Sequence, residues 1–169
     1  GNTGMQLSPA TPYGARTATS PCSLQHPSGA SQEKKDIFEI WRAHKPPYIA
    51  TVAPRYPLDL EEKFARAAAF TGPKMFLMLA ACPTGWLYDP GKTPEVAKLA
   101  VETGLWPLKE AINGVVTHTY VPKRKPVEAY LKLQGRFRHL FEPTVQTEAI
   151  QHIQARVDAY WERATREGS

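Results

Sequence analysis

Cys82 is the residue whose chemistry and surroundings make it the first candidate for a functional site. It follows an unbroken apolar run over residues 75–81 and precedes Pro83 and Gly85. Such a run is typical of a strand buried on both faces of a parallel sheet. Pro83 lacks a backbone donor and Gly85 permits a tight bend, so the strand is expected to stop here. The pattern predicts that Cys82 lies at the carboxyl end of a buried strand.

Two interpretations of that cysteine are open at this point. Ligands bind at the carboxyl ends of strands in open α/β sheets, and a thiol there is suited to metal binding or redox chemistry. Free cysteines are also often buried as small hydrophobic side chains, and position alone does not separate the two. The sequence contains no Cys-x-x-Cys pair, so a complete metal cage is not expected from this chain alone.

The elements that position Cys82 follow from hydrophobic spacing and from helix and turn residues. Helices are predicted over 36–44, 59–70, 93–104, 126–140 and 144–166, and strands over 48–53, 75–81, 105–112 and 115–120. The order helix, strand, helix, strand indicates a right-handed crossover and parallel pairing. The predicted fold class is α/β, with part of a doubly wound, mostly parallel sheet, flanking helices and a C-terminal helical extension.

Local signals support several of these elements. Asp36 is expected to cap the first helix, and Asn113-Gly114 between two apolar runs is typical of a hairpin turn. On the last helix, four apolar residues recur at helical spacing: Ile150, Ile153, Val157 and Trp161. This stripe predicts a terminal helix that docks on the rest of the domain.

The first 35 residues have little apolar periodicity and are rich in Pro, Thr, Ser and Gly. A loop of this length is usually functional or disordered. Small side chains suit a backbone that approaches a ligand closely, and they are equally compatible with a loose tail. Composition leaves both interpretations open.

The length of 169 residues corresponds to one ordinary domain, and no stretch is long and apolar enough to span a membrane. The chain starts without a secretory signal and has two cysteines, so we expect a reducing, cytoplasmic location. The formal net charge is +5, but most basic residues alternate with acids. The dense patch Lys123-Arg124-Lys125 is expected to be a solvated turn, and neither nucleic acid nor membrane is an expected partner.

Four stretches together resemble one family. They are Asn2-Thr3-Gly4-Met5-Gln6-Leu7-Ser8 with Ala10-Thr11-Pro12-Tyr13-Gly14-Ala15, Cys82-Pro83-Thr84-Gly85-Trp86, Leu99-Ala100-Val101-Glu102-Thr103-Gly104-Leu105-Trp106-Pro107-Leu108 and Tyr130-Leu131-Lys132-Leu133-Gln134-Gly135-Arg136-Phe137. Their order and separation are similar to those of the thiamine-diphosphate-binding β subunit of 2-oxoacid:ferredoxin oxidoreductases, most closely the pyruvate synthase type. The resemblance covers nearly the whole chain.

The resemblance implies a thiamine-diphosphate-binding fold and specific roles for the matching residues. Cys82 matches the late cysteine that completes a [4Fe–4S] cluster. Asn2 matches a position beside the thiazolium and the 2-oxoacid, where a carboxamide donates hydrogen bonds without adding charge. Thr3, Gly4 and Gln6 belong to the same cofactor-binding loop. Cys22 has no such match and is expected to be an incidental thiol.

The resemblance also divides the chain into three regions. Residues 1–35 correspond to the loop that faces cofactor and substrate, residues 36–106 to the C-terminal half of the thiamine-diphosphate-binding domain, and residues 107–169 to a hairpin and C-terminal helices. The Gly-Asp-Gly stretch that supplies the Mg²⁺ carboxylate and the other three cluster cysteines are absent from the sequence. The chain is therefore expected to be the C-terminal portion of the subunit, inactive alone.

The implied reaction is thiamine-dependent oxidative decarboxylation of a 2-oxoacid to acyl-coenzyme A, with electrons passed to iron–sulfur clusters and then to ferredoxin or another acceptor. Pyruvate is the expected substrate; an aryl 2-oxoacid such as phenylglyoxylate, or oxalate, is the alternative. The expected partners are the rest of the β subunit and the other oxidoreductase subunits.

Two other functions are kept as alternatives. One is a non-catalytic α/β interaction module that binds a partner through its basic surface and last helix. The other is a thiamine enzyme without a cluster, such as an acetolactate-type lyase, which has no need of Cys82. The five histidines are scattered, and each is expected at the surface or at a helix end rather than in an acid/base pair: His26, His44, His118, His139 and His152.

Overall fold

The structure is a computed structural model that describes residues 11–17 and 29–167. The helices are α1 (Ile37–Ala43), α2 (Pro57–Ala68), α3 (Pro83–Trp86), α4 (Thr93–Glu102), α5 (Glu128–Leu131) and α6 (Thr147–Glu167), with 3₁₀ turns η1 (Pro90–Lys92) and η2 (Gly135–Leu140). The strands are β1 (Tyr48–Val52), β2 (Lys74–Met78), β3 (Leu108–Ile112) and β4 (Val115–Tyr120). No described helix combines the length and the apolar character needed to cross a bilayer.

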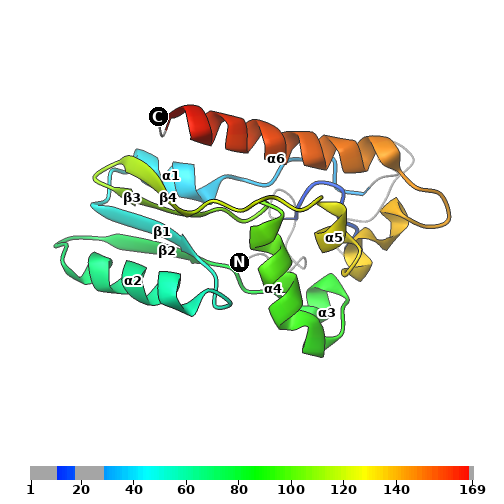
Figure 1. The fold of residues 1–169 in the computed structure, drawn as a ribbon, viewed down its shortest axis with the longest axis horizontal. Coiled ribbons are helices and arrows are strands. Elements are labelled where there is room, and N and C mark those ends of the chain that lie inside the picture. The colour runs from blue at the N-terminus through cyan, green and yellow to red at the C-terminus, as the bar shows by residue number, and fades with distance from the viewer. Residues whose placement is uncertain (1–10, 18–28, 168–169) are drawn as a thin grey trace.

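The strands form one four-stranded sheet in the order β2-β1-β3-β4. β1 pairs with β2 in parallel through the α2 crossover, and β3 pairs antiparallel with both β1 and β4 (Figure 1). The predicted α/β class and the parallel pairing of the first two strands are confirmed. The hairpin after residue 107 joins the same sheet, because β3 lies directly against β1.

The residues predicted to cap a helix and to form a hairpin turn do so in the structure. The Asp36 carboxylate accepts a hydrogen bond from the Glu39 backbone N–H and caps α1. Asn113 and Gly114 both have positive φ, 49° and 87°, which matches the twist of the two strands they connect. The helix predicted from residue 59 begins slightly earlier, with Pro57 in its first turn, where a missing N–H costs nothing.

Helices cover both faces of the sheet, as Figure 1 shows: α2 lies on one face, and α1 and α6 lie on the other. Phe76 of β2 packs with Tyr48 on the α2 face, whereas Met75 and Leu77 pack with Phe38 of α1 on the opposite face. Successive side chains of β2 point to opposite faces of the sheet, so β2 packs against the helices on both faces.

A larger hydrophobic core lies beyond the carboxyl ends of β1 and β2, among α3, α4, α5, η2 and α6. The apolar stripe predicted on the last helix is buried there: Ile150, Ile153, Val157 and Trp161 are all at most 7% exposed. The Trp161 indole N–H also donates to the Gly104 carbonyl oxygen at 3.1 Å, so α6 docks at the end of α4. The predicted docking of the terminal helix is confirmed.

Two predictions about individual elements are wrong. The strand leading to Cys82 is an edge strand, half-exposed over Met75–Leu77 and exposed at Met78, rather than one buried on both faces. The helix predicted over residues 126–140 is broken into α5 and η2, because Gln134 between them has an extended backbone (φ −119°, ψ 122°). Strand order and this break depend on distant contacts, which local hydrophobic spacing does not reveal.

A buried polar network fixes α2 to the sheet. The Glu110 carboxylate of β3 accepts hydrogen bonds from the Tyr48 hydroxyl at 2.6 Å and from Arg66 Nε at 3.1 Å. Lys63, fully buried, donates from Nζ to the Thr51 carbonyl oxygen at 2.9 Å and to Asp59 at 2.8 Å. Because each buried charge has hydrogen-bonding partners, the cost of burying it is largely offset.

The substitution Glu110→Gln tests this network. It keeps the shape but removes the charge that Arg66 and Tyr48 share, so the free energy of unfolding should fall by about 2 kcal/mol. Glu62→Gln is the matched control, because it removes an exposed partner 3.6 Å from the same Arg66. That control should change stability by no more than about 0.5 kcal/mol in urea unfolding. Equal losses in the two variants would contradict the assigned role of Glu110.

Candidate functional site

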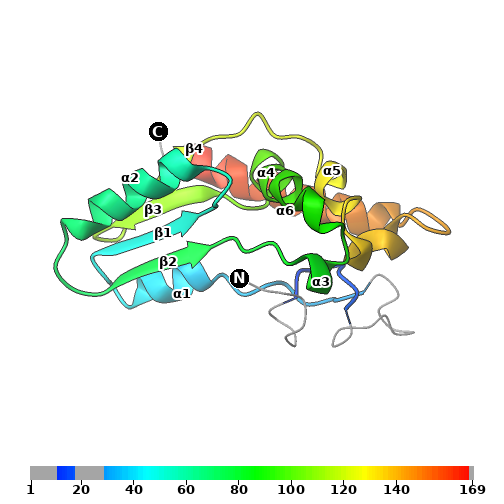
Figure 2. The ribbon, with the colours of Figure 1, turned by 90° about the horizontal axis from the view of Figure 1, so that it is seen from below.

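Cys82 lies beyond the end of β2, at the start of the short helix α3 (Figure 2). Its backbone is extended (φ −110°, ψ 105°), and its Sγ accepts a hydrogen bond from the Gly85 backbone N–H at 3.4 Å. The Trp86 backbone N–H donates to the Cys82 carbonyl oxygen at 2.9 Å. The thiol is half-buried. Cys82 lies after the strand as predicted, but β2 already ends at Met78, and Pro83 and Gly85 belong to the helix α3 rather than to a bend that stops the strand.

A buried arginine lies against the same turn. The Arg136 guanidinium stacks on the Trp86 ring, with Cζ 4.0 Å from the ring centroid, and also lies 5.0 Å from the Phe137 ring. Its Nε donates to Gln134 Oε1 at 2.8 Å, and its Nη2 lies 3.4 Å from the Tyr130 hydroxyl oxygen. Arg136 is 1% exposed, so its charge is held almost entirely out of water.

The charge of Arg136 is not compensated by a carboxylate among the described residues. Arg136 forms no ion pair there, and its buried Nη1 has no hydrogen-bond acceptor within the described part of the chain. Burial lowers the pKa of Arg136, and the negative forms of Tyr130, Tyr88 and Cys82 oppose that shift. The Cys82 thiol is thus one of the groups whose negative form would stabilise the guanidinium charge.

The neighbouring titratable groups respond to the same environment. Burial raises the pKa of the Tyr130 and Tyr88 hydroxyls, so both phenols stay neutral near pH 7. Burial also lowers the pKa of Lys34, and the positive charge of Arg136 adds to that shift. The guanidinium thus interacts with two neutral phenols, one lysine and one thiol, and the thiol is the group among these four that iron binds as an anion.

Backbone hydrogen bonds bring three separate segments to this point. The Gly135 N–H donates to the Leu87 carbonyl oxygen at 2.8 Å, which holds η2 against the end of α3. The Arg16 N–H donates to the Arg136 carbonyl oxygen at 2.7 Å, and the Gly14 N–H donates to the Ala30 carbonyl oxygen at 2.8 Å. The described part of the N-terminal loop is therefore joined through Arg16 to Arg136, the residue that stacks on Trp86.

The remaining predicted site residues lie outside the described residues. This applies to Asn2, Thr3, Gly4 and Gln6 of the cofactor loop, and also to Cys22. Within residues 11–17 and 29–167, no three His, Cys, Asp or Glu side chains gather as a metal site.

Sequence reasoning did not assign a role to Arg136. The residue belongs to one of the four stretches that resemble the oxidoreductase family, yet a single arginine in a short polar stretch is ordinarily a surface residue. Its burial depends on the extended residue Gln134 and on the close approach of Gly135 to Leu87, and neither is visible in hydrophobic spacing. The neighbouring Gly-Arg-Phe sequence was the available signal, because a glycine can permit a backbone contact that buries the next side chain.

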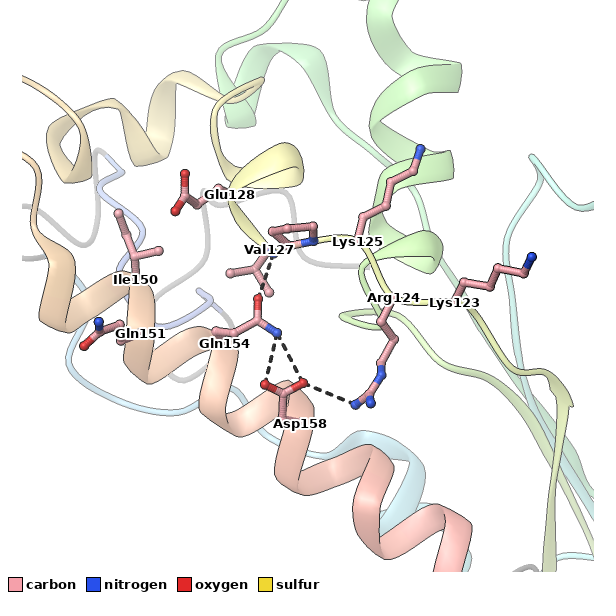
Figure 3. A pocket seen from close by; sticks show the side chains of 10 residues that line it. Lys123, Arg124, Lys125, Val127, Glu128, Ile150, Gln151, Gln154 and Asp158 are labelled. Atoms are coloured by element: carbon pink, nitrogen blue, oxygen red, sulfur yellow. Dashed lines mark hydrogen bonds and ion pairs between the residues drawn. The ribbon is translucent and has the colours of Figure 1, made fainter.

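A hollow of about 500 Å³ lies between the Lys123-Arg124-Lys125 turn and α6. Figure 3 shows the Arg124 and Gln154 side chains both directed at Asp158, and the Arg124 Nη1 lies 3.2 Å from an Asp158 oxygen. Lys125 forms an ion pair with Glu102 at 2.9 Å. All three basic side chains are exposed, as predicted for a solvated turn. Because Arg124 and Lys125 are matched by acidic partners, this surface has little positive charge left to attract an anion.

Comparisons with known proteins agree with the resemblance seen in the sequence. The chain is 46% identical over 158 residues to the pyruvate synthase subunit PorB of Methanocaldococcus jannaschii, covering 93% of this chain and 51% of that protein. It is 42% identical over 163 residues to PorB of Thermotoga maritima, covering 96% and 50%. The chain belongs to this family of oxidoreductase subunits.

One relative of similar identity is named for a different 2-oxoacid. The ketoisovalerate oxidoreductase subunit VorB of Pyrococcus abyssi is 41% identical over 165 residues, covering 96% of this chain and 51% of that protein. No family model matches the sequence. The chain spans about half the length of the curated relatives it matches.

The contact between Gly135 and Leu87 gives a test of how the site is held. A Cβ at position 135 would lie 2.7 Å from Leu87 Cβ and 2.8 Å from the Leu87 carbonyl oxygen. Gly135→Ala should push η2 away from α3 and lower the free energy of unfolding by about 2 kcal/mol.

Gly91→Ala is the control, because Gly91 is exposed and the nearest atom to an added Cβ there is a side-chain oxygen of Asp89 at 3.3 Å. It should change stability by no more than about 0.5 kcal/mol in the same thermal unfolding measurement. A Gly135→Ala protein as stable as the control would show that α3 and η2 do not pack as tightly as described.

Proposed function

We propose that this chain is part of a 2-oxoacid:ferredoxin oxidoreductase of the pyruvate synthase type, and that Cys82 supplies one thiolate ligand to a [4Fe–4S] cluster. In the complete enzyme, bound thiamine diphosphate with Mg²⁺ supplies the decarboxylation chemistry and the cluster accepts electrons one at a time. Coenzyme A receives the acyl group, and ferredoxin or another carrier receives the electrons. Pyruvate is the proposed substrate, with branched or aryl 2-oxoacids as alternatives set by pocket shape.

The observation that supports the cluster role is a buried, uncompensated guanidinium stacked on Trp86, in the same turn as the half-buried Cys82 thiol. Burying an unpaired charge is costly unless an opposite charge compensates it. A cluster held by four thiolates is an anion, so its presence at Cys82 would compensate Arg136. The names of the relatives, pyruvate synthase and ketoisovalerate oxidoreductase subunits, support the assignment to a 2-oxoacid oxidoreductase.

The residues of this chain then have distinct tasks. Cys82 binds iron through Sγ, and the extended backbone before α3 presents that sulfur at the turn. Trp86 and the core around it exclude water from the inner side, since Trp86 is 4% exposed. The Arg16 backbone N–H donates to the Arg136 carbonyl oxygen, so the described part of the N-terminal loop is joined to η2.

For that preceding loop, we propose that the Asn2 carboxamide faces the thiazolium and the bound 2-oxoacid. Its N–H groups would donate to the carbonyl or carboxylate of the substrate, where negative charge develops during the reaction. Thr3, Gly4 and Gln6 would line the same cofactor-binding loop. These four roles rest on the family resemblance.

The Cys82→Ala substitution in the complete oxidoreductase tests the cluster assignment. One cluster should be lost or converted, with lower iron content per enzyme and loss of its EPR signal, because alanine provides no ligand. Cys22→Ala is the matched control, since Cys22 is the other cysteine of the chain. That variant should retain the full iron content.

Unchanged iron and an unchanged EPR spectrum in Cys82→Ala would refute the cluster role. An oxidoreductase-like assembly that contains no iron at all would instead favour the non-catalytic interaction module or a cluster-free thiamine lyase.

The Asn2→Ala substitution tests the substrate-facing loop. It should lower kcat by about 10²-fold or more, as removal of one transition-state hydrogen-bond donor does in other enzymes. Thiamine diphosphate binding should stay nearly the same, because the carboxamide is assigned to the substrate rather than to the cofactor's anchoring groups. Steady-state turnover and cofactor titration by fluorescence quenching measure the two effects. Normal turnover would remove Asn2 from the site.

A further inference from the structure

The uncompensated charge of Arg136 indicates a role beyond packing. Its Nε and Nη2 have acceptors, Gln134 Oε1 and the Tyr130 hydroxyl, while Nη1 has none among the described residues. The side chain is 1% exposed, so water does not replace the missing acceptor at the surface. A buried, charged donor without a partner is rare in folded proteins and is expected to have a functional cause.

The position of Arg136 identifies which group would provide the acceptor. The guanidinium stacks on Trp86, which belongs to the same turn as Cys82 and hydrogen-bonds to the Cys82 backbone. Of the other groups whose charges act on Arg136, Tyr130 and Tyr88 are phenols that burial keeps neutral, and Lys34 is a base that supplies no negative charge. The sulfur of Cys82 is thus the neighbour that becomes anionic when it binds iron.

We propose that Arg136 is the countercharge of the iron–sulfur group held by Cys82, and that its Nη1 donates a hydrogen bond to a sulfur of that group. Arg136 is a positioning and potential-setting residue in this scheme. It binds no iron and transfers no proton. The inference rests on the proposed function of Cys82.

This role has a defined electrostatic consequence. One-electron reduction adds one negative charge to an iron–sulfur cluster, so a nearby fixed positive charge favours the reduced state. The effect is strong in a buried site, because the surroundings screen the charges weakly. Arg136 therefore raises the reduction potential of the cluster and makes it a better electron acceptor.

The experiment is a redox titration of the complete oxidoreductase, followed by EPR of the cluster whose signal disappears in Cys82→Ala. In Arg136→Gln, the equilibrium constant for reduction of that cluster should fall at least about tenfold, which corresponds to a shift of about 59 mV to more negative potential. Arg136→Lys keeps the positive charge, so the reduction potential of the cluster should stay close to that of the unsubstituted enzyme.

Arg138→Gln is the matched control, because it removes the same charge from an exposed residue of η2. Solvent screens that charge, so the reduction equilibrium should change by less than about twofold. If Arg136→Gln does not assemble, Gln134→Glu replaces it: a carboxylate 2.8 Å from Arg136 Nε would neutralise the guanidinium and should shift the potential in the same negative direction.

An unshifted potential in Arg136→Gln, or in Gln134→Glu where the first variant does not assemble, would overturn the inference. The proposed function would stand in that case, provided that Cys82→Ala still loses the cluster. Retention of all iron in Cys82→Ala would overturn both the proposed cluster role of Cys82 and the countercharge role of Arg136.

Discussion

The stacking of the Arg136 guanidinium on Trp86 is the contact on which the arrangement of the site depends. It joins the turn after β2 to η2, and the Arg136 carbonyl oxygen also holds the N-terminal loop through Arg16. Segments from both ends of the sequence and from its middle thus meet at one side chain. A cation stacked on an aromatic face is well stabilised when water is excluded, and this contact is nearly fully buried.

The sheet and the site are coupled through the chain between them. β1 and β2 are parallel, so their carboxyl ends lie at the same edge of the sheet. The residues that follow β2 therefore enter the larger core beyond that edge (Figure 2). The Leu79 N–H still donates to the Val52 carbonyl oxygen at 2.9 Å, which extends the pairing past the last residue of the strand. The position of Cys82 is therefore set by regular strand pairing and by a tightly packed turn, and both restrict its movement.

Sequence signals that act over a few residues, such as helix caps, turn residues and apolar spacing, correctly predicted several local features of the fold. The Asp36 cap, the Asn113-Gly114 turn and the apolar stripe on α6 all lie where these local signals predicted them. Features that depend on distant segments were not predictable in this way. The edge position of β2 follows from strand order, and the burial of Arg136 follows from the contact between Gly135 and Leu87.

The edge position of β2 has a practical consequence for work with this chain. The backbone N–H and C=O groups on its outer side have no strand partner within the described residues, and Phe76, Leu77 and Met78 beside them are incompletely covered. An apolar edge of this kind is a template for intermolecular strand addition. Expression of this polypeptide by itself should favour self-association and inclusion bodies, whereas co-production with a chain that adds a neighbouring strand should keep it in solution.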